Sequence, residues 1–147
     1  MDINVVIGAA LVCAAGGILP WINSELALVG AALLLPRPAL LVLVLACAMG
    51  QMVAKLALYG ATCWAPHRLP ARARVGLARA EKYRDRPRLM GAAVFTGALV
   101  SVPPFYLVTL ACGVLRIPLA LFALAGTAGT VVRYGALAWA GAALGTN

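Results

Sequence analysis

Acidic residues are scarce in this chain. Only four of its 147 residues are Asp or Glu, against twelve Lys or Arg, so the formal net charge is +8. Charged residues of either sign amount to 11%, whereas 64% are hydrophobic and the mean hydropathy is +0.98. A soluble domain with a hydrated surface needs more charge than this. The composition therefore predicts an integral membrane protein, and the length suffices for one bundle of about four membrane segments.

The chain also has only one histidine, and its cysteines are not spaced in pairs. The single histidine, His67, lies in a basic stretch, so neither a catalytic histidine pair nor a histidine zinc site is expected. The cysteines form no CxxC or Cys/His cluster, and we expect buried, reduced thiols at Cys13, Cys47, Cys63 and Cys112. We therefore expect no metal and no other cofactor. We also expect that the protein is not an enzyme, since a nucleophile with a neighbouring base is missing.

Long apolar stretches make up most of the remaining chain. There are four, Asn4–Leu35, Ala39–Trp64, Leu89–Leu115 and Ile117–Gly145. The second and the fourth are long enough to cross roughly 30 Å of hydrocarbon as single helices. Pro118 is tolerated there because it falls in the first turn of the fourth stretch.

The first and third stretches are interrupted. Pro20, Asn23, Ser24 and Glu25 break the first, and the sequence Ser101-Val102-Pro103-Pro104 breaks the third near its centre. Each half of such a stretch is too short to cross the bilayer at about 1.5 Å per residue. We therefore expect an all-α integral membrane fold with two re-entrant helical hairpins and two long transmembrane helices.

Positive charge gathers in one loop, Pro66–Arg88. Its basic residues are Arg68, Arg72, Arg74, Arg79, Lys82, Arg84, Arg86 and Arg88, against only Glu81 and Asp85. By the positive-inside rule this loop is cytoplasmic, and with one crossing per half both termini lie outside the cytoplasm. Charge confined to one loop indicates orientation and anionic lipid headgroups as partners, not nucleic acid. Residues 71–86 are expected as a helix on the inner leaflet, although orientation alone would account for the charge.

The two halves resemble each other in spacing. Pro20 precedes Gly30 by ten residues and Pro103 precedes Gly113 by ten, while a long helix carrying one cation follows in each half. We expect one membrane domain over residues 1–147, with repeat 1 at about 4–64, the basic loop at 66–88 and repeat 2 at about 89–145. With one crossing per half the repeats would be inverted, a plan common among transporters. The alternative is chance similarity between segments rich in glycine, alanine and leucine.

Glu25 and Arg133 are the most informative charges. A carboxylate deep in an apolar stretch costs at least about 2.5 kcal/mol unless it is paired, protonated or hydrated. A capping box does not explain Glu25, because Leu26 or Ala27 would occupy the third helical position. Asn23 or Ser24 as a simple N-cap, with Glu25 in the first helical turn, is the local alternative. Arg133, near the middle of the last stretch, stays charged and should meet Glu25 or a ligand anion.

Helix starts and a second cation complete the predicted site. Pro103 and Pro104 are expected in the first turn of a half-helix, with Ser101 or Val102 near its cap. Its N–H groups and those beside Ser24 would face an anion together with Lys55 and Arg133. The alternative for Lys55 is a side chain that snorkels to the interface. Glu25 would be the proton-coupling group, protonated while Arg133 holds the ligand.

The remaining charged, aromatic and glycine positions have ordinary explanations. Arg37 and Arg116 are expected as interface anchors. The residues Trp64, Trp139, Tyr59, Tyr83 and Tyr134 are expected in the interfacial belt or in packing. Gly141 and Gly145 form a GxxxG pattern, for which close helix packing is expected over a dimer face, while a homo-oligomer stays open.

The combined pattern resembles the DedA-like membrane proteins, also called the VTT-domain family. The resemblance rests on Leu19-Pro20 with Ser24-Glu25 and Gly30, on Gly50-Gln51, Ala54-Lys55 and Tyr59-Gly60, and on Val102-Pro103-Pro104-Phe105-Tyr106, Ala111-Cys112-Gly113, Arg116-Ile117-Pro118 and Arg133-Tyr134. One difference is the uncharged segment 97–102, where relatives tend to carry an arginine before the proline. Lys55 and Arg133 would supply that cation here.

The resemblance implies lipid transport in a bacterial inner (plasma) membrane. We expect a proton-linked flippase or scramblase of a lipid phosphate, such as a polyprenyl phosphate or a phospholipid headgroup. The expected substrate contacts are Arg133, Lys55, Pro103, Pro104 and Ser24, with Glu25 for the proton. The alternative is a membrane assembly or interaction subunit that transports nothing and whose buried charges set helix register.

Overall fold

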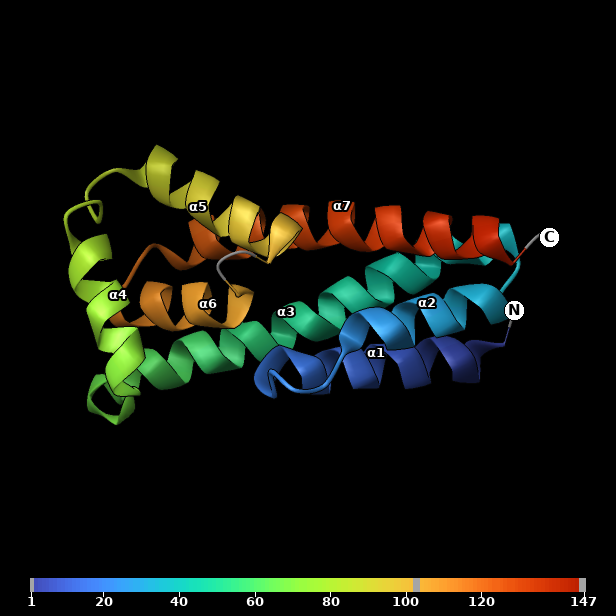
Figure 1. The fold of residues 1–147 in the computed structure, drawn as a ribbon, viewed down its shortest axis with the longest axis horizontal. Helices are drawn as coiled ribbons and strands as arrows, with labels where there is room; N and C mark the ends of the chain where they lie inside the picture. Colours follow the sequence, from blue (N-terminus) through green and yellow to red (C-terminus); the bar gives the residue numbers. More distant parts are fainter. Residues whose placement is uncertain (1, 102–103, 146–147) are drawn as a thin grey trace. The chain divides into compact units, whose positions relative to one another are not determined.

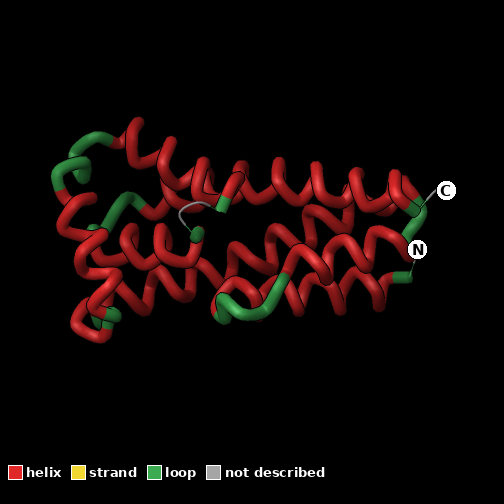
Figure 2. Tube along the Cα trace, viewed as in Figure 1, coloured by secondary structure: helices red, strands yellow, loops and turns green. Residues whose placement is uncertain are grey.

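The computed structural model describes residues 2–101 and 104–145, apart from the side chains of residues 72 and 73. Every element of regular secondary structure in this part of the chain is a helix, which confirms the predicted all-α class. Figure 1 and Figure 2 show the helices, which are α1 (Ile3–Ile18), α2 (Ser24–Leu34), η1 (Arg37–Ala39), α3 (Leu40–Trp64), η2 (Pro66–Arg68), α4 (Ala71–Glu81), α5 (Pro87–Val100), α6 (Phe105–Val114) and α7 (Leu119–Leu144).

The two longest helices reach membrane-spanning length. Helix η1 and α3 form a run of 28 residues, Arg37–Trp64, and α7 has 26 residues; both are apolar enough to cross a membrane. At about 1.5 Å per residue, each is longer than the roughly 30 Å core of a bilayer. These helices match the two predicted spans and indicate a membrane protein. The other apolar helices, α1, α2, α5 and α6, have between 10 and 16 residues and are each shorter than that core.

Both predicted interruptions are present. The first apolar stretch stops being helical after Ile18 and resumes at Ser24, and the third stops after Val100 and resumes at Phe105. Figure 1 shows α1 and α2 as an antiparallel pair, and α5 and α6 as another. Each interrupted stretch is therefore a helical hairpin made of two short helices.

Prolines precede two helices that were predicted to contain them. Pro104 is the N-cap residue of α6 and has an extended ψ of 129°, so the helix starts at Phe105; Val102 and Pro103 lie outside the described residues. Ser101 is the C-cap residue of α5 in the left-handed conformation, with φ of 57°, whereas Pro104 holds the N-cap position of α6. Pro118 likewise precedes α7, where its carbonyl accepts a hydrogen bond from the Phe122 N–H at 3.1 Å.

The chain divides into two compact units. Unit 1 comprises residues 1–54 and 130–147, and unit 2 comprises residues 55–129. Each unit holds one hairpin, part of α3 and part of α7. Each long helix therefore contributes to both units, and the predicted repeats, 4–64 and 89–145, stay a prediction.

Close backbone approaches hold unit 1 together. A Cβ on Gly50 of α3 would lie 2.7 Å from the carbonyl oxygen of Ala10 in α1, so only glycine fits there. Helix α2 packs on the last part of α7, where a Cβ on Gly141 would lie 3.1 Å from Val29. The GxxxG pattern of α7 therefore faces α2 within the same chain, as the expectation of ordinary helix packing requires.

Unit 2 repeats this packing plan. A Cβ on Gly129 of α7 would lie 2.6 Å from the carbonyl oxygen of Phe95 in α5, and one on Gly113 of α6 would lie 2.7 Å from that of Tyr59 in α3. Gly50 and Gly129 each stand ten residues after the first residue of their helix. In both units the first hairpin helix packs on the long helix that follows it, and the second packs on the other long helix.

Helix α4 belongs to unit 2 and is itself part of the basic loop. It spans Ala71–Glu81, within the segment for which a helix was predicted. Figure 1 shows α4 running across the end of α6, with which it is in contact.

Candidate functional site

Glu25 lies in the first turn of α2. The Asn23 side chain caps this helix, since its Oδ1 accepts hydrogen bonds from the N–H groups of Glu25 at 3.1 Å and Leu26 at 3.2 Å. The structure thus selects Asn23, between the two candidate caps Asn23 and Ser24. A carboxylate in the first turn is favoured by the partial positive charge of the helix N-terminus.

Arg133 in the middle of α7 forms an ion pair with Glu25 through Nη2 and Oε1. The Arg133 side chain is 19% exposed and that of Glu25 is 39% exposed. Both residues belong to unit 1, in which α2 and α7 pack closely. The structure therefore brings together the two charges that the sequence placed deepest in apolar helices.

Three polar side chains lie near this pair with little access to solvent. Ser24 is 6% exposed, and Tyr134 and Thr130 of α7 are each 1% exposed. Within the described residues, the hydroxyls of Tyr134 and Thr130 have no hydrogen-bond partner. Ser24 and Cys13 lie next to the Tyr134 hydroxyl, and the Cys13 thiol donates to the Ser24 carbonyl at 3.6 Å. A buried hydroxyl without a hydrogen-bond partner costs about 1–3 kcal/mol. This polar cluster therefore stabilises the fold less than apolar side chains would.

Lys55 occupies the corresponding place in unit 2. Its side chain is almost fully buried, with an exposure of 3%. The ammonium lies 5.3 Å from the ring centroid of Phe105 and 5.5 Å from that of Tyr106, the first two residues of α6. Both distances are within cation–π range. No ion pair joins Lys55 to a carboxylate of the described part of unit 2, so its charge is not neutralised there.

The two cations therefore follow one pattern. In each unit, a basic side chain from a long helix contacts the second residue of the second hairpin helix. In unit 1 this residue is Glu25, and in unit 2 it is Tyr106. The predicted site residues divide accordingly: Ser24, Glu25 and Arg133 belong to unit 1, and Lys55 and Pro104 belong to unit 2.

Sequence reasoning missed the aromatic and hydroxyl groups around these cations. Tyr134 was expected in the interfacial belt or in packing; it is packed in the interior, and the position of its hydroxyl beside Ser24 was not foreseen. Its position directly after Arg133 is the signal that was available. Phe105 and Tyr106 directly follow Pro104, just as Ser24 and Glu25 follow Asn23, so alignment of the two hairpins by helix start would have identified them.

Arg116 ends α6 in an unusual conformation. Its φ is 51°, and the Ile117 N–H donates to the Cys112 carbonyl at 3.0 Å, as in a Schellman motif. Tyr59 lies nearby and donates its hydroxyl to the Ile117 carbonyl at 2.5 Å. A surface pocket of about 510 Å³ opens here, lined by Tyr59, Cys63, Trp64 and Arg116. Trp64 is 91% exposed, which suits the predicted interfacial position.

All four cysteines are free thiols, and three of them are buried. Buried thiols of this kind pack as small apolar side chains, which explains their placement without any reactive role. No protein-family model, no curated protein and no solved structure matches this chain. The functional inference therefore rests on the chemistry of the two units.

Proposed function

We propose that this chain is a membrane transporter of a lipid phosphate, a proton-linked flippase or scramblase of a bacterial inner membrane. The observation that carries the proposal is the ion pair between Glu25, in the first turn of a short hairpin helix, and Arg133, in the middle of a long apolar helix. It agrees with the resemblance to DedA-like proteins.

The free-energy cost of holding an ion pair among apolar helices favours a role in transport over a purely structural role. Two charges held among apolar helices lose hydration, and apolar side chains of similar volume often give equal or better stability. Glu25 keeps 39% exposure, so the pair has access to solvent or ligand. A phosphate could replace the carboxylate beside Arg133, because a guanidinium binds either anion through two parallel hydrogen bonds.

The architecture of the hairpins supports a transporter. Both consist of helices shorter than a bilayer core, the hallmark of re-entrant segments, and both units share one packing plan around Gly50 and Gly129. We infer an inverted repeat in which broken helices meet the substrate near the midplane. The basic loop is cytoplasmic in this topology.

Lys55 is the second proposed anion contact. It is buried at the start of α6, where the helix N-terminus adds positive charge and no carboxylate of the described part of unit 2 compensates it. An anion bound there would relieve the cost of a buried cation. Ser24, Pro104 and Pro103 complete the proposed substrate contacts, Pro103 lying outside the described residues.

Transport is linked to protons because Glu25 and the lipid phosphate alternate as the anion beside Arg133. When the lipid phosphate occupies Arg133, Glu25 loses its counter-charge and takes up a proton. When the phosphate leaves, Glu25 releases the proton and pairs with Arg133 again. One proton then moves for each anion released.

The decisive experiment is lipid transport in reconstituted vesicles, with and without a proton gradient. We expect Glu25→Gln and Arg133→Ala each to abolish transport while the protein stays folded. Matched controls, Asp85→Asn and Arg79→Ala, remove like charges from the basic loop and should retain transport. Activity retained in both site variants would refute the site.

A charge swap separates this function from the alternative assembly subunit. Glu25→Arg combined with Arg133→Glu restores an ion pair but moves the anion-binding group from α7 to α2. If the pair only sets helix register, the swap should behave as wild type in every assay. We expect restored stability without transport. Wild-type protein that moves no lipid or solute at all would favour the assembly subunit.

A further inference from the structure

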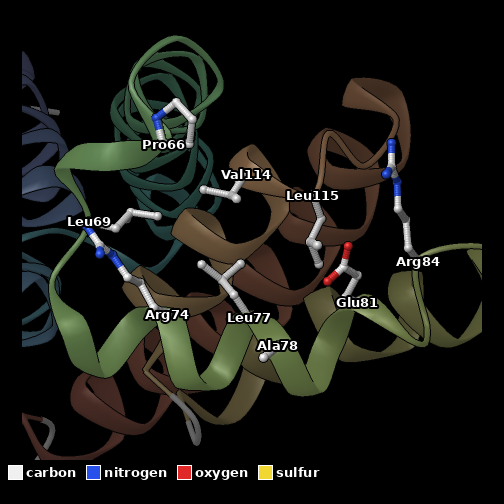
Figure 3. Close-up of a pocket in the computed structure, with 9 residues that line it drawn as sticks. All are labelled: Pro66, Leu69, Arg74, Leu77, Ala78, Glu81, Arg84, Val114 and Leu115. Atoms are coloured by element: carbon white, nitrogen blue, oxygen red, sulfur yellow. The ribbon is translucent and has the colours of Figure 1, made fainter.

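A groove lies beside α4 in unit 2, where the basic loop folds against the end of α6. One face of α4, with residues at i, i+3 and i+7, forms a wall through Arg74, Leu77 and Glu81. Leu115, after α6, and Leu69, before α4, line the groove as well. Its volume is about 360 Å³, and Figure 3 shows the side chains that surround it.

Cationic groups stand at both ends of this groove. Figure 3 shows Arg74 at one end and Arg84 at the other, with Leu77 and Leu115 between them. Arg74 donates from Nη2 to the His67 carbonyl at 2.9 Å, which fixes its guanidinium beside η2. A guanidinium has five N–H donors, so most of them stay available to a ligand. In the described part of unit 2, neither arginine forms an ion pair with Glu81 or Asp85.

The combination of apolar walls and arginine ends suits an amphiphile. Phosphodiesters bind guanidinium groups through charge-assisted hydrogen bonds, and acyl chains favour leucine surfaces. A basic segment directly beside a membrane span attracts acidic lipids, and α4 begins seven residues after Trp64, the last residue of a candidate span. The volume of the groove suits a headgroup with the first part of its acyl chains, not a whole lipid.

We propose that this groove binds the headgroup of an acidic glycerophospholipid, with its phosphodiester on one of the two arginines and its upper acyl chain against Leu77 and Leu115. The bound lipid would hold α4 against α6 at the membrane surface. The inference needs a membrane setting but uses no residue of the proposed transport site, so it stands or falls separately from transport.

Lipid retention by purified protein tests the proposal. The protein is reconstituted in nanodiscs of phosphatidylglycerol and phosphatidylcholine, and phosphatidylglycerol that stays bound after release is counted by native mass spectrometry across a range of lipid fractions. Arg74→Ala with Arg84→Ala removes both ends of the groove. Arg79→Ala with Arg86→Ala removes the same charge from exposed positions of the same loop outside the groove.

We expect the groove variant to weaken phosphatidylglycerol retention at least about tenfold more than the control variant, the scale of one lost charged hydrogen bond or more. Leu77→Gln keeps every charge and should also lower retention. Equal losses in the two double variants would overturn the proposal, since they indicate diffuse attraction. Undiminished retention in the groove variant or in Leu77→Gln would overturn it too. Should the alanine variant fail to fold, Arg74→Gln with Arg84→Gln takes its place, compared in the same way with Arg79→Gln and Arg86→Gln.

Discussion

Two basic side chains lie deep in apolar helices, and their surroundings differ. Arg133 has Glu25 beside it, so its charge is neutralised within the chain. Lys55 has the rings of Phe105 and Tyr106, which attract a cation but do not neutralise it. The charge of Arg133 is therefore compensated within unit 1, whereas no carboxylate of the described part of unit 2 compensates that of Lys55.

The variant Lys55→Met tests this difference. Methionine matches the length of the lysine stem and removes a buried charge whose desolvation costs several kcal/mol, so we expect equal or higher thermal stability in detergent. Transport should fall at least about tenfold, as expected for loss of a charged contact to a phosphate. Lys55→Arg keeps the charge and should retain part of the activity. Full transport by Lys55→Met would show that Lys55 has no role in binding the substrate.

Glycine positions decide how closely the helices approach one another. Gly50 and Gly129 meet backbone carbonyls of the first hairpin helices, so a methyl group at either position requires a backbone shift. By contrast, a Cβ on Gly135 of α7 meets nothing within 4 Å. Gly50 and Gly129 are thus among the glycines on which the helix packing depends, and sequence spacing alone did not distinguish them from the rest.

Alanine at these glycines provides a test of the packing plan. Gly50→Ala and Gly129→Ala should each destabilise the protein by about 1–3 kcal/mol, the usual cost of overpacking. Gly135→Ala should be neutral or stabilise it by up to about 1 kcal/mol, because alanine favours helix. Thermal denaturation in detergent measures all three. A similar response at all three positions would contradict the close approaches.

At the scale of helices, the sequence predicted the breaks better than their details. Proline and polar residues inside apolar stretches located both hairpins, and the failure of a capping box left Asn23 or Ser24 as the cap of the helix that carries Glu25. The start of α6 was predicted too early, because proline tolerates both a first helical turn and an N-cap position. Only the extended backbone of Pro104 distinguishes the two.

The proposed topology of the whole molecule places the basic loop in the cytoplasm and both ends of the chain outside it. A single cysteine at Arg79, in a chain whose native cysteines are replaced by alanine, should resist a membrane-impermeant maleimide added to intact spheroplasts and react after permeabilisation. A single cysteine at Asp2 should react before permeabilisation. Labelling of the Arg79 position in intact spheroplasts would invert the proposed orientation.

The sequence by itself determined the membrane character, the helical class, the two long spans and both breaks, because these follow from composition, helix length and the local effects of proline. It also singled out Glu25 and Arg133, since charges within apolar runs are costly wherever they occur. Only the tertiary structure decided that these two pair, that Lys55 meets aromatic rings instead, and that Tyr134 has a buried hydroxyl beside Ser24. Contacts between residues distant in the chain depend on how helices approach each other, and spacing along one helix does not contain that information.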